Sequence, residues 1–235
     1  MRAIIRIRWD LPWYDADGND RFPERKTKEW QAERLRLFET YTLPSLRAQT
    51  HEDWIACLQI DPDVTFDTFA FSAEDLDRRV RAVMSRDDEA TAGYGAERRA
   101  FVMRLDSDDM ISPSTIEKLI ANARKDRFVM LNDAIAWSER EQAFRSWINP
   151  APPCYGKIVE GPIDFSIFGH HVENGRNAVR VDSHEDQPAI LGVVLHKNNI
   201  SNAADGPWSS MVLAPGAQAL WKSVFPCVAK EASKR

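Results

Sequence analysis

Three aspartates within four positions, Asp106, Asp108 and Asp109 in the segment "FVMRLDSDDMISPS", carry the clearest chemical signal in the sequence. An apolar run that predicts a strand precedes them, and a segment that predicts a helix follows. Carboxylates this close repel one another unless solvent, an arginine or a cation compensates them. The Asp-x-Asp spacing lets Asp106 and Asp108 converge on one hard cation, which prefers oxygen ligands and keeps positions for water and substrate phosphates.

The position of these aspartates supports a metal site. Ligands of open α/β sheets bind outside the carboxyl ends of the strands, and the three aspartates fall at such an end. The simpler alternative is a helix cap with a solvated turn, which Asp and Ser also favour. An EF-hand loop starting at Asp106 is excluded, because Ile111 would stand where its sharp turn requires glycine. His196 ends the later apolar run "AILGVVLH" and is either a third ligand or a structural histidine.

The elements that must position these residues alternate along the chain. The pattern predicts strands at 3–7, 54–60, 100–106 and 127–133, and helices at 29–47 (bent or broken at Pro44), 72–81 and 112–125. This alternation predicts an α/β fold with a largely parallel sheet. The second half is less regular: its clearest strand is 189–196, and the proline-rich stretch "NPAPPCYGK" predicts a surface crossing that does not extend the sheet. We expect one domain over 1–235, with halves of about 1–130 and 131–235.

Composition limits the classes of partner. The sequence has 235 residues with 31 Lys and Arg against 36 Asp and Glu, a formal charge of −5, which argues against a nucleic-acid partner. The three cysteines lack the spacing of a disulfide framework or a zinc site. Because the sequence has no signal-peptide pattern and no run long enough for a transmembrane segment, we expect a cytoplasmic protein. The basic end, 230–235, could touch an anionic membrane as a peripheral contact.

A family resemblance rests on three phrases in order. "LRLFETYTLPSLRAQTHEDWIACLQID" followed by "RLDSDD" resembles the nucleotide-sugar half of GT-A glycosyltransferases. The phrases "TLPSLRAQT", "RLDSDD" and "VVLHKNNISN" are similar to a bacterial group of rhamnosyltransferases. The resemblance implies a GT-A-like three-layer α/β/α sandwich with a mixed, mostly parallel central sheet. It also implies a metal-dependent, inverting transfer of a sugar from a nucleoside-diphosphate donor to a saccharide acceptor, with L-rhamnose from dTDP-rhamnose as the suggested donor.

The resemblance also implies roles for single residues. Asp61 matches the carboxylate that hydrogen-bonds the pyrimidine base; a turn-former before Pro62 is the alternative. Asp106 matches the acid near the ribose and the metal, and Asp108 the direct metal ligand, with Asp109 orienting them. The cofactor would be Mg²⁺ or Mn²⁺, because an acidic site cannot otherwise hold the diphosphate.

The catalytic base is expected in the second half of the chain. The segment "DSHEDQP" resembles the acid motif on the acceptor side of inverting GT-A enzymes, which makes Asp186 the first candidate base and Glu185 the second. A charged loop before a strand is the alternative. Arginines that could contact the diphosphate or balance the aspartates are Arg34, Arg98 and Arg104.

Two other classes of protein remain open. A sugar-nucleotide nucleotidyltransferase would need a Gly-rich, Arg- or Lys-bearing loop after the first strand, and "WDLPWYDADGND" has a single glycine. A non-catalytic, metal-stabilised binding domain would bind a cation without any dependence on nucleotide.

Overall fold

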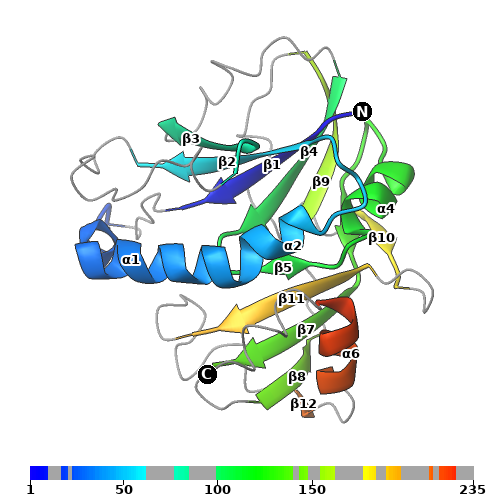
Figure 1. Ribbon diagram of the computed structural model, residues 1–235. Coiled ribbons are helices and arrows are strands. Elements are labelled where there is room, and N and C mark those ends of the chain that lie inside the picture. Colours follow the sequence, from blue (N-terminus) through cyan, green and yellow to red (C-terminus); the bar gives the residue numbers. More distant parts are fainter. Residues whose placement is uncertain are drawn as a thin grey trace.

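The larger of two sheets forms the centre of the protein (Figure 1). The structure is a computed structural model, and it describes residues 1–9, 17–20, 23–61, 77–84, 99–139, 143–147, 154–161, 177–183, 189–196, 212–213 and 217–225. The larger sheet has seven strands in the order β10-β6-β9-β4-β1-β2-β3. Their bounds are β1 (Ala3–Arg8), β2 (Trp54–Ile60), β3 (Val80–Met84), β4 (Arg99–Asp106), β6 (Val129–Leu131), β9 (Tyr155–Glu160) and β10 (Val179–Val181). All pairings are parallel except those of β9, which is antiparallel to both β4 and β6.

A smaller five-stranded sheet lies beside the first, in the order β12-β8-β7-β11-β5. Its strands are β5 (Met110–Ile111), β7 (Asp133–Ser138), β8 (Ala143–Trp147), β11 (Ile190–Leu195) and β12 (Val212–Leu213). β7 and β11 are parallel to each other. Both halves of the sequence contribute to both sheets, because β9 and β10 join the larger sheet and β5 joins the smaller one.

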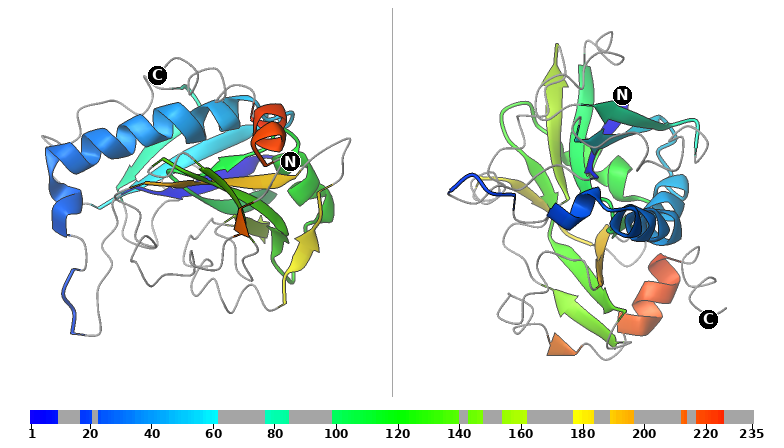
Figure 2. Two further views of the ribbon diagram at one scale, coloured as in Figure 1. Left: turned by 90° about the horizontal axis from the view of Figure 1, so that it is seen from below. Right: turned by 90° about the vertical axis from the view of Figure 1, so that its left-hand side faces the viewer.

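The described helices are η1 (Pro23–Lys26), α1 (Lys28–Leu37), α2 (Leu43–Arg47), α4 (Thr115–Asn122) and α6 (Ala217–Val224). A π-helical turn, η2 (Phe38–Thr42), joins α1 to α2, and Figures 1 and 2 show the three as one continuous rod. The α-helical hydrogen bonding is interrupted before Pro44 and restarts at α2, although the rod itself stays continuous through η2. Pro44 stands in the first turn of α2, where its missing N–H and its fixed φ disturb a helix least.

Alternating side chains give the larger sheet two different faces. One face carries Ile5, Ala56 and Phe101, all fully buried in one core cluster with residues of α2 and α4. The opposite face is apolar near the start of the strands, with Ile4 and Val102, and becomes polar toward their carboxyl ends. The prediction of an α/β fold with a mixed, mostly parallel sheet and flanking helices is confirmed.

Two predicted features differ from the structure. Val80 and Arg81, expected at the end of a helix, belong to β3, because the run from Val80 to Met84 pairs in parallel with β2. Residues 72–76 of that expected helix lie outside the described residues. The "CYGK" phrase, interpreted as a surface crossing, leads into β9 at the middle of the larger sheet. A Cβ at position 156 would lie 2.6 Å from the Val102 carbonyl oxygen, which is too close, so only glycine fits there. Close packing of β9 against β4, and not a turn, therefore explains this glycine.

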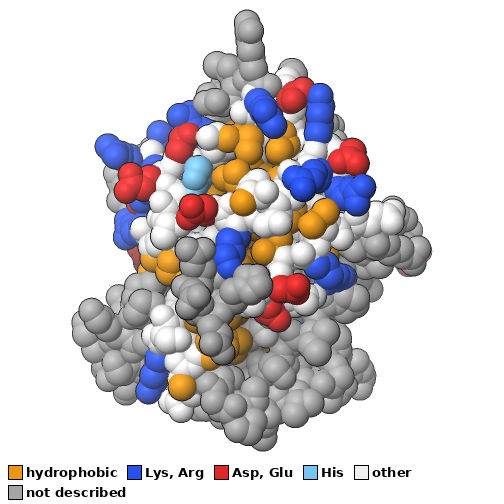
Figure 3. Space-filling view, turned by 90° about the vertical axis from the view of Figure 1, so that its right-hand side faces the viewer, with side chains coloured by type: hydrophobic (Ala, Val, Ile, Leu, Met, Phe, Trp, Pro, Cys, Tyr) orange, Lys and Arg blue, Asp and Glu red, His pale blue; other side chains and the backbone are white. Residues whose placement is uncertain are grey.

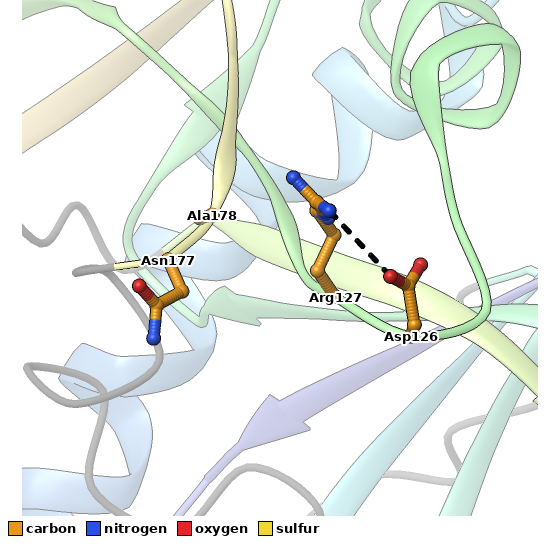
Figure 4. Close-up of a pocket in the computed structure, with 4 residues that line it drawn as sticks. All are labelled: Asp126, Arg127, Asn177 and Ala178. Atoms are coloured by element: carbon orange, nitrogen blue, oxygen red, sulfur yellow. Dashed lines mark ion pairs between the residues drawn. The ribbon is translucent and has the colours of Figure 1, made fainter.

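The surface away from the carboxyl ends of the strands has mixed charge. On the face turned to the viewer in Figure 3, described acidic and basic side chains are interspersed. A shallow hollow on the surface lies among Asp126, Arg127, Asn177 and Ala178, where Arg127 Nη2 is 3.6 Å from Asp126 Oδ2 (Figure 4). Within the described residues, no helix is long and apolar enough to cross a membrane.

Candidate functional site

Asp108 is the centre of a buried polar cluster where β4 and β11 end. Its Oδ2 accepts a hydrogen bond from His196 Nε2 at 2.7 Å and lies 3.2 Å from Arg34 Nη1 of α1. The same Nη1 donates to Ser107 Oγ at 3.1 Å. Burial alone would raise the pKa of Asp108, but the charge of Arg34 and the hydrogen bond from His196 outweigh it and hold that pKa below its ordinary value. Asp108 is therefore ionised at neutral pH.

The rod formed by α1, η2 and α2 holds the aspartate turn in place. Thr42 Oγ1 donates to the Ser107 carbonyl at 2.9 Å, and Ser45 Oγ accepts from the Ile111 backbone N–H at 3.3 Å. Gln49 Nε2 donates to the Ser112 carbonyl at 2.9 Å, and its Oε1 accepts from the backbone N–H of Ile116 in the first turn of α4. These contacts explain the "SLRAQ" phrase physically: its serine and glutamine satisfy buried backbone groups on the far side of the aspartates.

Asp106 points to a different partner. It ends β4 and lies 3.0 Å from Arg104 Nη2, two residues back on the same face of the strand. Burial would lower the pKa of Arg104, but the charge of Asp106 and a contact with Tyr155 raise it above its ordinary value, so this guanidinium stays charged. The predicted balancing of the aspartates by Arg34 and Arg104 therefore has a geometric basis at two separate carboxylates.

Asp109 differs from both neighbours. Burial, the charge of Asp108 and the charge of Asp106 raise the pKa of Asp109 well above its ordinary value. Burial and the same acidic surroundings, Asp109 and Asp106, raise the pKa of the buried Cys154 thiol. The cluster thus favours one ionised carboxylate and disfavours another next to it, as expected where like charges share a site of low polarity.

The predicted metal ligands are brought together only in part. Asp108 and His196 meet, whereas Asp106 is turned toward Arg104. In the part of the chain that the structure describes, no three His, Cys, Asp or Glu side chains gather as a metal cluster. Asp108 and His196 nevertheless offer an ionised oxygen and, in the tautomer with its proton on Nδ1, an imidazole nitrogen at one point, where a cation would replace the hydrogen bond between them. That pair fits a divalent cation whose remaining positions are filled by water and substrate phosphates.

Asp61 follows β2 and is fully buried. Its Oδ2 lies 2.9 Å from Nη2 of Arg25 in η1, and the same nitrogen is 2.7 Å from Asp20 Oδ2. No pattern in the sequence singles out Arg25, which lies in the polar segment between the predicted strand at 3–7 and the predicted helix at 29–47. Only the folded chain shows that its guanidinium joins two carboxylates far apart in sequence.

The remaining candidates fall on segments outside the described residues. Arg98 precedes β4, and Glu185 and Asp186 lie between β10 and β11. Of the described residues on either side of the second segment, Ser183 donates its N–H to Asp133 Oδ2 at 2.8 Å, at the start of β7. Ala189, on the other side, is buried at the start of β11, the opposite end of that strand from His196.

Comparison with known proteins assigns the chain to a family. The sequence model of a family described as "Putative rhamnosyl transferase" matches residues 17–139, which is more than half of the chain. The protein belongs to this family, and a family of glycosyltransferases implies a sugar donor and an acceptor. The matched region contains the rod of α1 and α2, β2, and the aspartates that follow β4. No curated protein matched the sequence.

Proposed function

We propose that the protein transfers L-rhamnose from dTDP-rhamnose to a saccharide hydroxyl, with inversion and with the help of Mg²⁺ or Mn²⁺. The observation that carries the proposal is the contact at 2.7 Å between Asp108 and His196, 88 positions apart in sequence, at the carboxyl edge of the strands. Family membership supplies the reaction class, and the contact supplies a place at which a phosphorylated donor could be held. We also propose that the fold is of the GT-A type.

Different residues of the chain orient the carboxylate, contact the donor and hold the cation. Arg34 and His196 hold the Asp108 carboxylate ionised and oriented, and we assign Asp106, which pairs with Arg104, to the ribose of the donor. Asp108 and His196 would hold the cation, with Asp106 as a further ligand once it leaves Arg104. When bound, the cation neutralises the diphosphate and stabilises the departing nucleoside diphosphate as a Lewis acid.

The acceptor needs a base on the opposite face of the sugar. Inversion requires a carboxylate that takes the proton of the acceptor hydroxyl. The hydroxyl oxygen then attacks the anomeric carbon as the nucleoside diphosphate leaves. We assign this role to Asp186, with Glu185 as the alternative. Arg98 and Arg104 are proposed to contact the diphosphate, where guanidinium groups bind phosphate oxygens in paired hydrogen bonds.

Calorimetric titration with Mn²⁺ and Mg²⁺, in the presence and absence of dTDP, tests the proposal. We expect each ligand to tighten the binding of the other, because the diphosphate completes the coordination of the cation. Cation binding that is independent of nucleotide would instead indicate a non-catalytic binding domain. Release of pyrophosphate from dTTP and a sugar 1-phosphate would indicate a nucleotidyltransferase, and either result would overturn the proposal.

A further inference from the structure

A chain of contacts joins the rod to the ends of β7 and β11. Glu139 follows β7 directly, and its Oε1 accepts from Tyr41 Oη of η2 at 2.7 Å. Its Oε2 accepts from Nη2 of Arg36 in α1 at 3.0 Å. The backbone N–H of Glu139 donates to the carbonyl of Leu195, the last residue of β11, at 2.9 Å. The side chain of Glu139 is therefore tied to the rod, and its backbone is tied to the residue before His196.

These contacts close a ring with the Asp108 cluster. β7 and β11 are parallel, and the register of their last residues makes Glu139 and His196 neighbours where the strands end. His196 Nε2 donates to Asp108 Oδ2 at 2.7 Å, and the same oxygen lies 3.2 Å from Arg34 Nη1. Arg34 and Arg36 both belong to α1, so the ring begins and ends on one helix. His196 is thus held at its side chain by Asp108 and, through the preceding residue, by Glu139.

The contacts of Glu139 with the rod leave its carboxylate little freedom. The side chains of Glu139 and Arg36 are 24% and 27% exposed, so water screens the pair only in part. Glu33, one turn earlier on α1, orients Arg36, because its two oxygens accept from Nε and Nη2 at 2.8 and 2.9 Å. Burial and the Glu139 carboxylate raise the pKa of Tyr41 above its ordinary value, so the hydroxyl stays protonated and donates.

Apolar packing already holds the rod against the smaller sheet. Leu37 of the rod lies in one core cluster with Ile135 of β7 and Val194 of β11. Burial of apolar surface is non-directional, so it does not fix where the strand ends lie along the rod. The hydrogen bonds of Glu139 are directional, and they lie at the end of the sheet where His196 must be placed.

We propose that Glu139 is a positioning residue for His196: it ties the ends of β7 and β11 to the rod and so keeps the imidazole within reach of Asp108 and of the divalent cation. The part that concerns the cation rests on the proposed function, whereas the position of the imidazole can be measured without a cation. Groups that support a metal ligand from outside the coordination sphere typically change metal affinity by about 10- to 100-fold when they are removed.

NMR of the metal-free protein with isotope-labelled histidine tests the position first. In EDTA, the buried Nε2–H of His196 should give a slowly exchanging signal, which a His196→Gln variant assigns. We expect Glu139→Ala to shift or lose this signal and Glu33→Ala to keep it. Glu33 is the matched control, because it pairs with the same guanidinium at a similar exposure, 20%, but lies on the rod itself. An unchanged His196 signal in Glu139→Ala would overturn the inference and leave the proposed function standing.

Cation affinity tests the consequence of the position. With dTDP present, Mn²⁺ should bind Glu139→Ala about tenfold more weakly than the parent, and Glu33→Ala within about twofold of it. Glu139→Gln should regain most of the affinity, because its amide oxygen can still accept from Tyr41. Tyr41→Phe, which removes only the hydroxyl, gives the same test if Glu139→Ala does not fold. Parental affinity in the folded variants that lose the contact would contradict the inference.

A double variant shows whether Glu139 acts through His196. Added to His196→Ala, Glu139→Ala should cause no further loss of Mn²⁺ affinity, because the imidazole that it positions is already absent. A full additional loss would mean that Glu139 acts in another way, and the inference would fail. If Mn²⁺ does not bind the parent with or without dTDP, the proposed function fails, and the histidine signal alone decides whether Glu139 positions His196.

Discussion

Asp61 and Asp108 are buried aspartates at the same edge of one sheet, and each is paired with an arginine from the segment between β1 and β2. Their surroundings differ in the balance of charge. At Asp61, a single guanidinium, that of Arg25, joins two carboxylates. At Asp108, a single carboxylate accepts a hydrogen bond from His196 and forms an ion pair with Arg34. Among the described residues, the first arrangement leaves guanidinium donors unused, and the second leaves an anion with several partners. The first has one more carboxylate than guanidinium, whereas the second has its charge balanced by Arg34 and would bind a cation only where His196 gives up its hydrogen bond to Asp108.

Arg25→Ala should produce the largest effect and should act on stability. Removing the guanidinium leaves Asp61 and Asp20 without their common partner, and breaking a buried pair in this way costs about 3–5 kcal/mol. Urea unfolding followed by circular dichroism measures the loss. Arg2→Ala is the control, because it removes the exposed pair with Asp53 and should cost less than about 1 kcal/mol. Similar losses in the two variants would mean that the ion pairs of Arg25 with Asp20 and Asp61 do not stabilise the fold.

Asp108→Asn should act on turnover more than on stability. The amide keeps the size of the side chain but loses the charge, so we expect transfer, or hydrolysis of dTDP-rhamnose, to fall at least about 100-fold, which corresponds to about 2.7 kcal/mol. Turnover is measured by release of dTDP at saturating donor and Mn²⁺. Normal turnover in this variant, or a larger loss of stability than in Arg25→Ala, would contradict the conclusion that Asp108 serves turnover more than stability.

Gln49→Ala tests whether the residue that follows the rod helps to position the Asp108 turn. The glutamine hydrogen-bonds backbone groups on both sides of Pro113, and its loss leaves buried polar groups unsatisfied at a cost of about 2 kcal/mol. We expect the variant to unfold at lower urea concentration and to bind Mn²⁺ with dTDP more weakly, while the effect of Arg25→Ala is unchanged by it. Non-additive losses of stability in the double variant Arg25→Ala/Gln49→Ala would show that the surroundings of Asp61 and Asp108 are coupled.

Asp109→Asn should give the smallest effect, and its size depends on pH. Because the folded protein raises the pKa of Asp109, ionisation of this group opposes folding, and the penalty is absent below its ordinary pKa and grows as the pH rises. In EDTA, the variant should therefore gain stability over the parent near pH 8 and match it near pH 3. Asp108 has the opposite sign: its lowered pKa stabilises the fold above about pH 4, and this contribution is lost as the pH falls through the lowered pKa. Loss of stability in Asp109→Asn at pH 8 would refute this account.

Local patterns in the sequence predict part of this molecule well. The strands around Leu58 and Met103 are mostly apolar runs, and the strand around Ile5 alternates apolar and polar residues; both patterns predict strands, and the alternation with helices indicates how they pair. The aspartates after β4 and the histidine after β11 are visible as polar residues at strand ends. Their meeting at 2.7 Å depends on how the smaller sheet packs beside the larger one, and no local pattern contains that information.

The parts that sequence could not predict involve long-range contacts. β9 follows a proline-rich stretch and contains Gly156, so its composition indicates a turn, whereas close packing against β4 requires the glycine. Arg25 is one of 31 basic residues, and only the folded backbone shows that it meets Asp61. The assignments of Asp186, Glu185 and Arg98 stay predictions, because they fall outside the described residues.

The place of β9 between β4 and β6 has a consequence for the order of folding. The strands β1, β2, β3 and β4 come early in the chain, but the strand that pairs with the outer side of β4 is reached only at Tyr155. Until then, β4 presents an unpaired edge next to the aspartates, and such an edge can pair with another chain. A fragment that stops at Glu139 would keep this edge open. We therefore expect the fragment to aggregate, although it contains almost every residue of the region that defines the family.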